Sequence, residues 1–246
     1  KPVGWTRAIA ELIDNSMDAN SRNIVISKET ARLEVKDDGD GIPDIVSLLT
    51  HGAHVEHANA RMPVGVWGVG AKDCFLWLWG TTSIDTFREG ENAFAQLDWE
   101  EESQKTGYKV EVDREEGAGR GTVISCDNIR RRASKAQWDK TIADLSFLFS
   151  PGLRQGINVS VKDGEYTYPL WPYDPKNTDE HVAFSGEVNG KTFSADVSTL
   201  PKGATNEHAG IHVVYGHRIV CDLNEVLEGY SIGRIYGTCL LYTSDA

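Results

Sequence analysis

The chain has 246 residues, of which 40% are hydrophobic and 25% are charged, and this balance is ordinary for a soluble globular protein. Its 25 Lys and Arg residues against 37 Asp and Glu residues give a net charge of −12, which argues against an extensive nucleic-acid-binding surface. No apolar run approaches the length of a membrane-spanning helix, and no pair of the four cysteines has the C-x-x-C spacing of a zinc or redox site. We therefore expect a cytoplasmic protein with reduced thiols and no membrane association.

The apolar periodicity divides the chain into helical and strand-rich segments. Helices are predicted over residues 5–19, 44–49, 71–79 and 134–149. Strands are predicted over residues 24–27, 33–35, 82–87, 93–99, 108–112, 122–126 and 191–197, with a hairpin turn at 89–90 and a loop at 115–121. A set of strands is predicted over 156–170, and two strands around a tight turn at 215–217 are predicted over 210–220. This order of helix, strands, helix and strands predicts the α+β class rather than a regular βαβ alternation.

The first predicted helix carries a carboxylate and an amide on one face. Glu11 and Asn15 lie four residues apart, among apolar residues that have the spacing of a buried helix face. An amide oxygen can bind a hard cation such as Mg²⁺, while a neighbouring carboxylate can orient or deprotonate a water molecule. Taken alone, the pattern favours the alternative of a solvent-exposed acidic face.

The stretch "VKDDGDGIP" places Asp37 at the end of a predicted strand, followed by Gly39 and Gly41. A buried carboxylate there could accept a hydrogen bond from an exocyclic amino group such as that of adenine, and the glycines allow a close approach of the backbone. A calcium loop is excluded because no Glu follows at the required spacing. A plain acidic turn remains an alternative for this motif alone.

A third motif, "PVGVWGVGAKD", runs from a glycine-rich loop into a predicted helix. Free N–H groups in such a loop can bind phosphate oxygens. It is not a P-loop, because Lys72 is followed by Asp73 rather than by Ser or Thr. Lys72 could add positive charge toward a phosphate or be a solvated helix residue. Thr122 opens a later strand and could share a contact to adenine with Asp37, or be an ordinary strand start.

In this order and spacing, the motifs resemble those of the GHKL ATPase superfamily, which includes gyrase-type topoisomerases, the large heat-shock chaperone, histidine kinases, MutL and the MORC proteins. The chain looks closest to the MutL-like and MORC-like members. The resemblance implies a Bergerat-type layered α/β sandwich that binds ATP over residues 1–155. It also implies a β-rich, transducer-like domain over residues 156–246, which we expect to be truncated because the chain stops without a finished element.

The resemblance also implies roles for individual residues. Glu11 looks like the general base that activates the attacking water, and Asn15 looks like the Mg²⁺ ligand. Asp37 looks like the residue that reads adenine. The nucleotide-binding residues that the resemblance implies are Asn15, Asp37, Gly39, Gly41, Ile42, Gly65, Gly68, Val69, Gly70, Lys72 and Thr122.

The function that the resemblance implies is an ATP-dependent switch: ATP and Mg²⁺ bind, two copies of the chain form a homodimer, and hydrolysis is slow. A non-hydrolysing ATP-sensing interaction module and a histidine-kinase catalytic domain stay open as alternatives. The client, whether protein or DNA, is not identified. The histidines at 51, 54 and 57 match no standard zinc pattern, and the arginines at 130–132 are expected to be solvated.

Overall fold

The computed structural model describes residues 4–49, 70–102, 109–173, 181–188, 191–198, 210–222 and 238–243. The chain divides into two compact units. The first comprises Lys1–Leu145 and Gly156–Leu170, and the second comprises Ser146–Gln155 and Trp171–Ala246. This division differs from the expected boundary at residue 155, because residues 156–170 join the sheet of the first unit.

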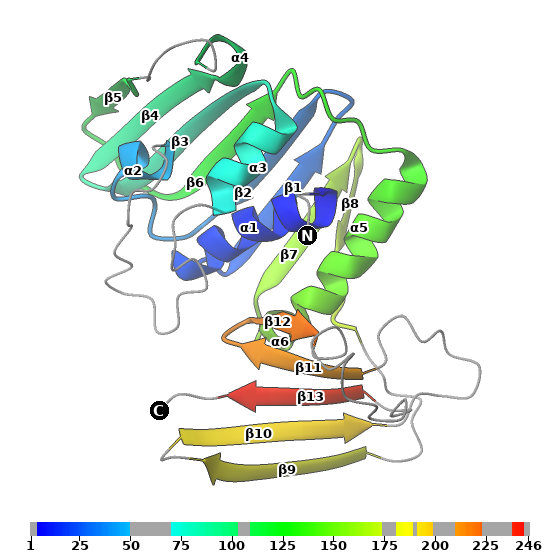
Figure 1. Cartoon of the computed structure of the whole chain (residues 1–246). Helices are drawn as coiled ribbons and strands as arrows, with labels where there is room; N and C mark the ends of the chain where they lie inside the picture. Colours follow the sequence, from blue (N-terminus) through cyan, green and yellow to red (C-terminus); the bar gives the residue numbers. More distant parts are fainter. Residues whose placement is uncertain are drawn as a thin grey trace. The chain divides into compact units, whose positions relative to one another are not determined.

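The described helices and strands of the first unit follow one another along the chain as drawn in Figure 1. They are α1 (Trp5–Asp18), β1 (Asn23–Lys28), β2 (Arg32–Asp37), α2 (Ile45–Leu49), α3 (Gly70–Leu78), β3 (Thr81–Glu89), β4 (Glu91–Asp98), α4 (Trp99–Glu102), β5 (Val112–Glu115), β6 (Ala118–Asp127), most of α5 (Lys135–Leu148), β7 (Asn158–Asp163) and β8 (Tyr166–Pro169).

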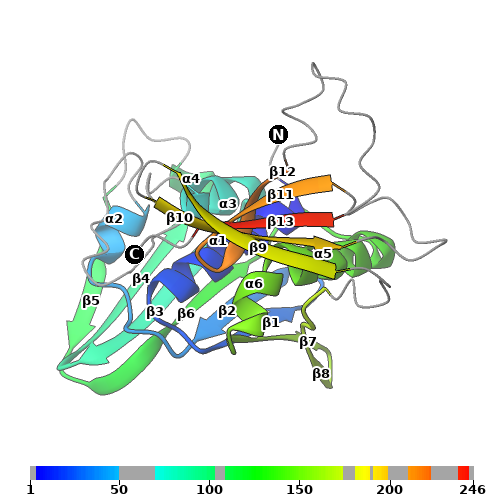
Figure 2. The same cartoon turned by 90° about the horizontal axis from the view of Figure 1, so that it is seen from below.

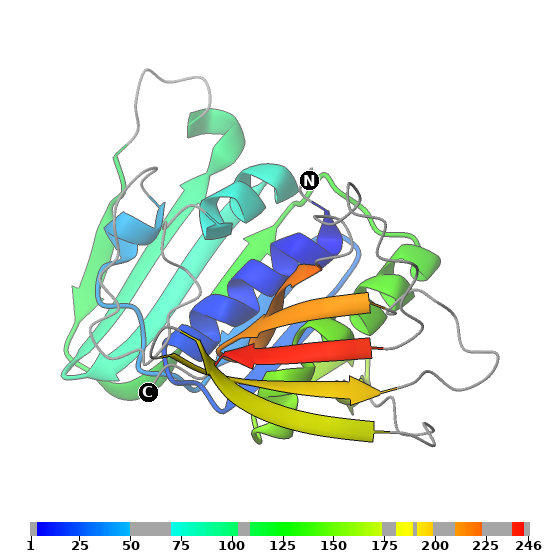
Figure 3. The same cartoon turned by 60° about the horizontal axis from the view of Figure 1, so that its bottom comes forward.

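The strands of this unit form one eight-stranded sheet in the order β5-β4-β3-β6-β2-β1-β7-β8. Among the described strands, every pair in this sheet is antiparallel except β1 with β7, which are parallel. Helices α1, α3 and α5 lie over one face of the sheet, and α1 and α3 lie side by side (Figures 1, 2 and 3). The unit is therefore a two-layer α+β structure, as the sequence predicts.

The core lies between this helix layer and the sheet. Ile9, Leu12 and Ile13 of α1 are fully buried, and the alternating residues Leu33 and Val35 of β2 point to the same layer. Burial of one helix stripe and of alternate strand residues is what an amphipathic helix on a half-covered sheet requires. The buried thiols of Cys74 and Cys126 are free, and burial raises the pKa of both.

Tryptophan rings connect the helices within this layer. The ring of Trp5 in α1 makes edge contacts with Trp77 of α3, at 5.4 Å between centroids, and with Trp138 of α5, at 6.2 Å. The guanidinium of Arg131 lies 5.8 Å from the ring centroid of Trp77. The aromatic end of α3 is thus used for packing, with Trp77 between α1 and an arginine.

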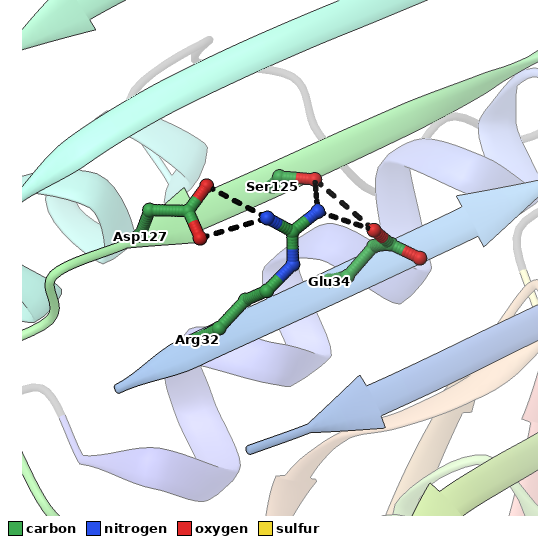
Figure 4. Close-up of polar contacts among 4 residues, drawn as sticks. All are labelled: Arg32, Glu34, Ser125 and Asp127. Atoms are coloured by element: carbon green, nitrogen blue, oxygen red, sulfur yellow. Dashed lines mark hydrogen bonds and ion pairs between the residues drawn. The ribbon is translucent and has the colours of Figure 1, made fainter. Parts of the chain in front are cut away.

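The opposite face of the sheet is polar. Arg32 of β2 binds both carboxylate oxygens of Asp127 in β6, at 2.8 and 3.0 Å, and donates to Glu34 at 2.8 Å (Figure 4). It also donates to Ser125 of β6 at 3.0 Å. Because Arg32 and Glu34 alternate with the buried Leu33 and Val35, this cluster lies on the face that α1 does not cover.

The second unit has its own, smaller sheet. Its described elements are the last turn of α5, α6 (Ser150–Arg154), β9 (His181–Val188), β10 (Lys191–Ser198), β11 (Gly210–Tyr215), β12 (Arg218–Asp222) and β13 (Thr238–Thr243). The strand order is β12-β11-β13-β10-β9, with β11 and β13 parallel (Figure 3). Phe147, Val214 and Ile219 form a buried cluster in this unit.

Most sequence-predicted elements are confirmed within one to three residues, three predictions need correction, and a few short elements were not predicted. The strand expected over 108–112 begins only at Val112, and the loop expected over 115–121 is partly strand, because β6 already pairs with β3 at Ala118. The strand expected over 93–99 stops one residue early, where α4 begins, and α6 follows α5 without having been predicted. Strands β9 and β13 were not predicted either. Among the described helices, none is both long and apolar enough to cross a membrane.

Candidate functional site

Three polar residues form a buried row across neighbouring strands beneath the helix layer. Asp37 of β2 pairs with Thr122 of β6, and Thr122 pairs in turn with Thr86 of β3. Their exposed fractions are 7%, 3% and 1%. Sequence reasoning identified Asp37 and Thr122 but missed Thr86, because strand register is not visible in a single sequence.

The Asp37 carboxylate is held in place by donors from three segments. Its Oδ2 accepts a hydrogen bond from the Ser16 hydroxyl of α1 at 2.9 Å, and its Oδ1 accepts one from the Gly39 N–H at 2.9 Å. Burial raises the pKa of Asp37, and hydrogen bonds from Gly39, Ser16 and the Thr122 N–H oppose that rise. A carboxylate has about four acceptor positions, so one remains for a donor on a ligand.

The loop after Asp37 is pressed against β3 at Gly41. The φ angle of Gly41 is +75°, and a Cβ there would lie 2.7 Å from the Phe87 carbonyl oxygen. The next N–H, that of Ile42, donates to the Thr86 hydroxyl at 2.7 Å. Glycine is needed at position 41 both for the backbone angle and for the close approach. Gly41 and Ile42 thus lie beside the polar row.

The next residue, Asp38, closes the loop from the other side and was not predicted to matter. Its carboxylate accepts hydrogen bonds from the Ser21 hydroxyl and from the N–H groups of Arg22 and Asn23, each at 2.8 Å. These bonds hold the pKa of Asp38 well below its usual range, although burial acts in the opposite direction. Asp38 therefore ties the Asp37 loop to the turn between α1 and β1.

Glu11 and Asn15 lie on α1, whose neighbour in the helix layer is α3. The Glu11 carboxylate lies so close to Gly70, the first residue of α3, that a Cβ at Gly70 would overlap it. Arg7 lies 3.9 Å from Glu11 and 3.9 Å from Asp73. A carboxylate at a helix N-terminus is favourably placed, because the first N–H groups of a helix point outward and carry partial positive charge.

Asn15 is half-buried, and its amide nitrogen is buried without a hydrogen-bond partner among the described residues. A buried amide N–H without a hydrogen-bond partner costs free energy. We therefore expect a bound ligand to accept a hydrogen bond from it. The unpartnered atom is an N–H donor, so it fits an acceptor such as a phosphate oxygen rather than a cation. Among the described residues, no group of three or more His, Cys, Asp or Glu side chains could itself hold a metal ion.

Lys72 is not a solvated helix residue. Its side chain is 1% exposed, and burial lowers its pKa. The alternative of a solvent-exposed Lys72 is therefore wrong. The predicted phosphate-binding residues Gly65, Gly68 and Val69, and the three histidines in "HGAHVEH", lie outside the described residues.

The arginines at 130–132 are exposed, as expected, and two of them also make hydrogen bonds to the end of α3, Arg130 through its backbone. The Arg130 N–H bonds the carbonyl groups of Leu78 and Trp79 at 3.2 Å, and Arg131 Nε bonds the carbonyl of Trp77 at 3.3 Å. These bonds satisfy the carboxyl end of α3, where helix carbonyl groups lack intrahelical partners. The amino end of the same helix is the one that touches Glu11.

Comparison with known proteins identifies the family of the chain. A search of curated proteins finds no match. A family model described as "Histidine kinase-, DNA gyrase B-, and HSP90-like ATPase" matches residues 4–134, which is more than half of the 246 residues. The matched segment contains Glu11, Asn15, Asp37 and Thr122, together with strands β1 to β6. The chain therefore belongs to the family of histidine kinase-, DNA gyrase B- and HSP90-like ATPases.

Proposed function

We propose that this chain binds ATP with Mg²⁺ and hydrolyses it slowly, so that nucleotide state controls its conformation and self-association. Membership in the ATPase family supports ATP binding in general. The single observation that carries the proposal is the buried Asp37 carboxylate. Donors from α1, from Gly39 in the following loop and from β6 hold this carboxylate in one orientation. Such a preorganised acceptor suits the amino group of adenine.

The adenine end of the proposed site is formed by Asp37, Thr122 and the loop at Gly41 and Ile42. Asp37 would accept from the exocyclic amino group, and Ile42 would pack near the base. The support is that all of these residues meet on the helix side of β2, β6 and β3. Gly39 contributes by donating its N–H to Asp37 and so fixing the carboxylate.

The phosphate end is proposed to lie where α1 faces the start of α3. There Asn15 would hold Mg²⁺, which when bound neutralises phosphate charge, and Gly65, Gly68, Val69, Gly70 and Lys72 would surround the phosphates. Glu11 would orient a water molecule and accept its proton as the water attacks in line. The support for a phosphate site is the contact between Glu11 and Gly70 and the unpartnered N–H donor of Asn15, which suits a phosphate oxygen.

Two substitutions test the two ends separately. Glu11→Gln should retain ATP binding and lose phosphate release, whereas Asp37→Asn should lose ATP binding. Matched controls are Glu29→Gln, in the exposed turn between β1 and β2, and Asp163→Asn, at the exposed end of β7. Phosphate release that is unchanged in Glu11→Gln contradicts the role of Glu11. Undiminished ATP affinity in Asp37→Asn contradicts the adenine site, and ATP binding by the unmodified chain without any release favours the ATP-sensing alternative.

We further propose that the ATP-bound chain forms a homodimer and that it is of the MutL-like and MORC-like type. We also propose that the second unit has a transducer-like role. The support for that role is the unit's five-stranded sheet, which follows the ATPase fold along the chain. ATP-dependent pairing should appear in sedimentation velocity, with a higher sedimentation coefficient in the presence of ATP and Mg²⁺. An ATPase rate per chain that is constant over a wide range of protein concentration contradicts it.

A further inference from the structure

Thr86 is a buried hydroxyl that links the base-binding loop to the polar row. It is 1% exposed, its Oγ1 accepts the Ile42 N–H at 2.7 Å, and the same oxygen lies 3.3 Å from Thr122 Oγ1. The Gly121 carbonyl oxygen lies slightly farther away, at 3.5 Å. Thr86 therefore touches both the loop and the residue proposed to contact adenine.

The hydrogen-bonding capacity of these hydroxyls can be counted. A threonine hydroxyl has one proton to donate and two lone pairs. Thr86 uses one lone pair for Ile42, and its proton has two acceptors within reach, of which Thr122 is the nearer. If the Thr86 proton goes to Thr122, the proton of Thr122 is directed away from Thr86. The Thr122 hydroxyl then offers a donor beside the Asp37 carboxylate, which offers an acceptor.

We infer that Thr86 is a positioning residue that sets base specificity by orienting the Thr122 hydroxyl as a donor next to the Asp37 acceptor. An acceptor beside a donor complements the edge of a 6-aminopurine, which has an amino donor at C6 and an acceptor at N1. A 6-oxopurine such as guanine or hypoxanthine has the reverse pattern, an acceptor at C6 and a donor at N1. The site would reject it at both positions, since buried polar groups would be left unpaired.

This inference rests on the proposed nucleotide site, and its test uses the base rather than the phosphates. Thr86→Val removes the hydroxyl with little change of shape, and Thr86→Ser restores it. Thr82→Val is the matched control, because Thr82 is equally buried in the same strand and its hydroxyl accepts from Trp99 Nε1 at 2.9 Å. The probes are ATP, inosine triphosphate and 1-deaza-ATP, in which a C–H group replaces N1 of adenine.

Dissociation constants are measured for each variant with each probe. We expect Thr86→Val to weaken ATP binding by about tenfold more than 1-deaza-ATP binding, the value of one hydrogen bond, because loss of the acceptor for Ile42 affects both probes equally. The preference for ATP over inosine triphosphate should narrow by a similar factor. Thr86→Ser should restore the unmodified values, and Thr82→Val should leave the preference as it is.

The outcomes separate the inference from the function on which it rests. If the unmodified chain binds no adenine nucleotide, both fail. If it binds ATP but Thr86→Val weakens ATP and 1-deaza-ATP equally, or weakens neither, only the inference fails. Should Thr86→Val not fold, the unmodified chain still decides: ATP and 1-deaza-ATP binding with equal affinity overturns the orientation of Thr122 as a donor.

Discussion

Replacing Gly41 by Ala should damage both stability and nucleotide binding, and the structure gives the size of the effect. At φ +75° an alanine is strained by about 1–2 kcal/mol relative to glycine. Its Cβ would also lie 2.7 Å from the Phe87 carbonyl oxygen and 3.0 Å from Thr86 Oγ1. Moving buried backbone to relieve such overlap costs about a further 1–3 kcal/mol. The total loss for Gly41→Ala is therefore about 2–5 kcal/mol.

Gly90 provides a control that separates the two contributions. It has a similar φ of +88°, in the turn between β3 and β4, but a Cβ there would meet nothing within 4 Å. Gly90→Ala should therefore show the angular strain alone. Urea unfolding of both variants and titration with ATP make the comparison. If the two variants lose the same free energy of unfolding, to within about 0.5 kcal/mol, the close packing of the loop on β3 adds nothing to the cost of alanine at position 41, and the prediction is refuted.

Three further predictions concern side chains around the sheet. Asp38→Ala should lower the free energy of unfolding at neutral pH by about 1–2 kcal/mol, as much as loss of a helix N-cap does. The folded state lowers the pKa of Asp38. The difference in free energy of unfolding between the variant and the unmodified chain should therefore shrink as pH falls below the ordinary aspartate value of 3.8. A series of urea titrations across pH checks this, and a difference that grows in acid would contradict it. Burial raises the pKa of Asp37, and binding of adenosine needs the ionised carboxylate. As pH decreases, the affinity for adenosine should therefore begin to fall at a higher pH than the pKa of an ordinary aspartate. Affinities measured by calorimetry that stay constant down to about pH 4 would count against this. Arg32→Ala should lower the free energy of unfolding by no more than about 1 kcal/mol, because the Arg32 side chain that makes the ion pairs is 40% exposed. It should leave ATP affinity unchanged, because the cluster lies on the sheet face opposite α1. A weakened ATP affinity would refute that placement.

The elements and the motif residues of the site could be predicted because their signals are local. The helical spacing around Glu11 and Asn15 and the glycines after Asp37 each constrain only a few neighbouring residues. Thr86 could not be found in this way, since its importance comes from register: it lies opposite Thr122, which is 36 residues away along the chain. No periodicity within a strand reports its partner.

The burial of Lys72 was missed for a related reason. Composition predicts that charged side chains are solvated, and it cannot show which of them a neighbouring element covers. The assignment of residues 156–170 to a later domain was drawn at a natural break in the sequence. The structure instead places that hairpin in the first unit, because β7 pairs with β1.

The parallel pairing of β1 with β7 has a consequence for how the chain emerges during synthesis. Residues 23–28 are made early, but their partner strand, residues 158–163, leaves the ribosome only after more than a hundred further residues. Until then one edge of β1, with the apolar side chains of Ile24, Val25 and Ile26, has no neighbouring strand, and such edges promote aggregation. A shortened protein that ends with the family-matched segment at residue 134 would keep that edge open permanently, so a fragment in which β1 is paired on both edges needs to continue through β7 at residue 163.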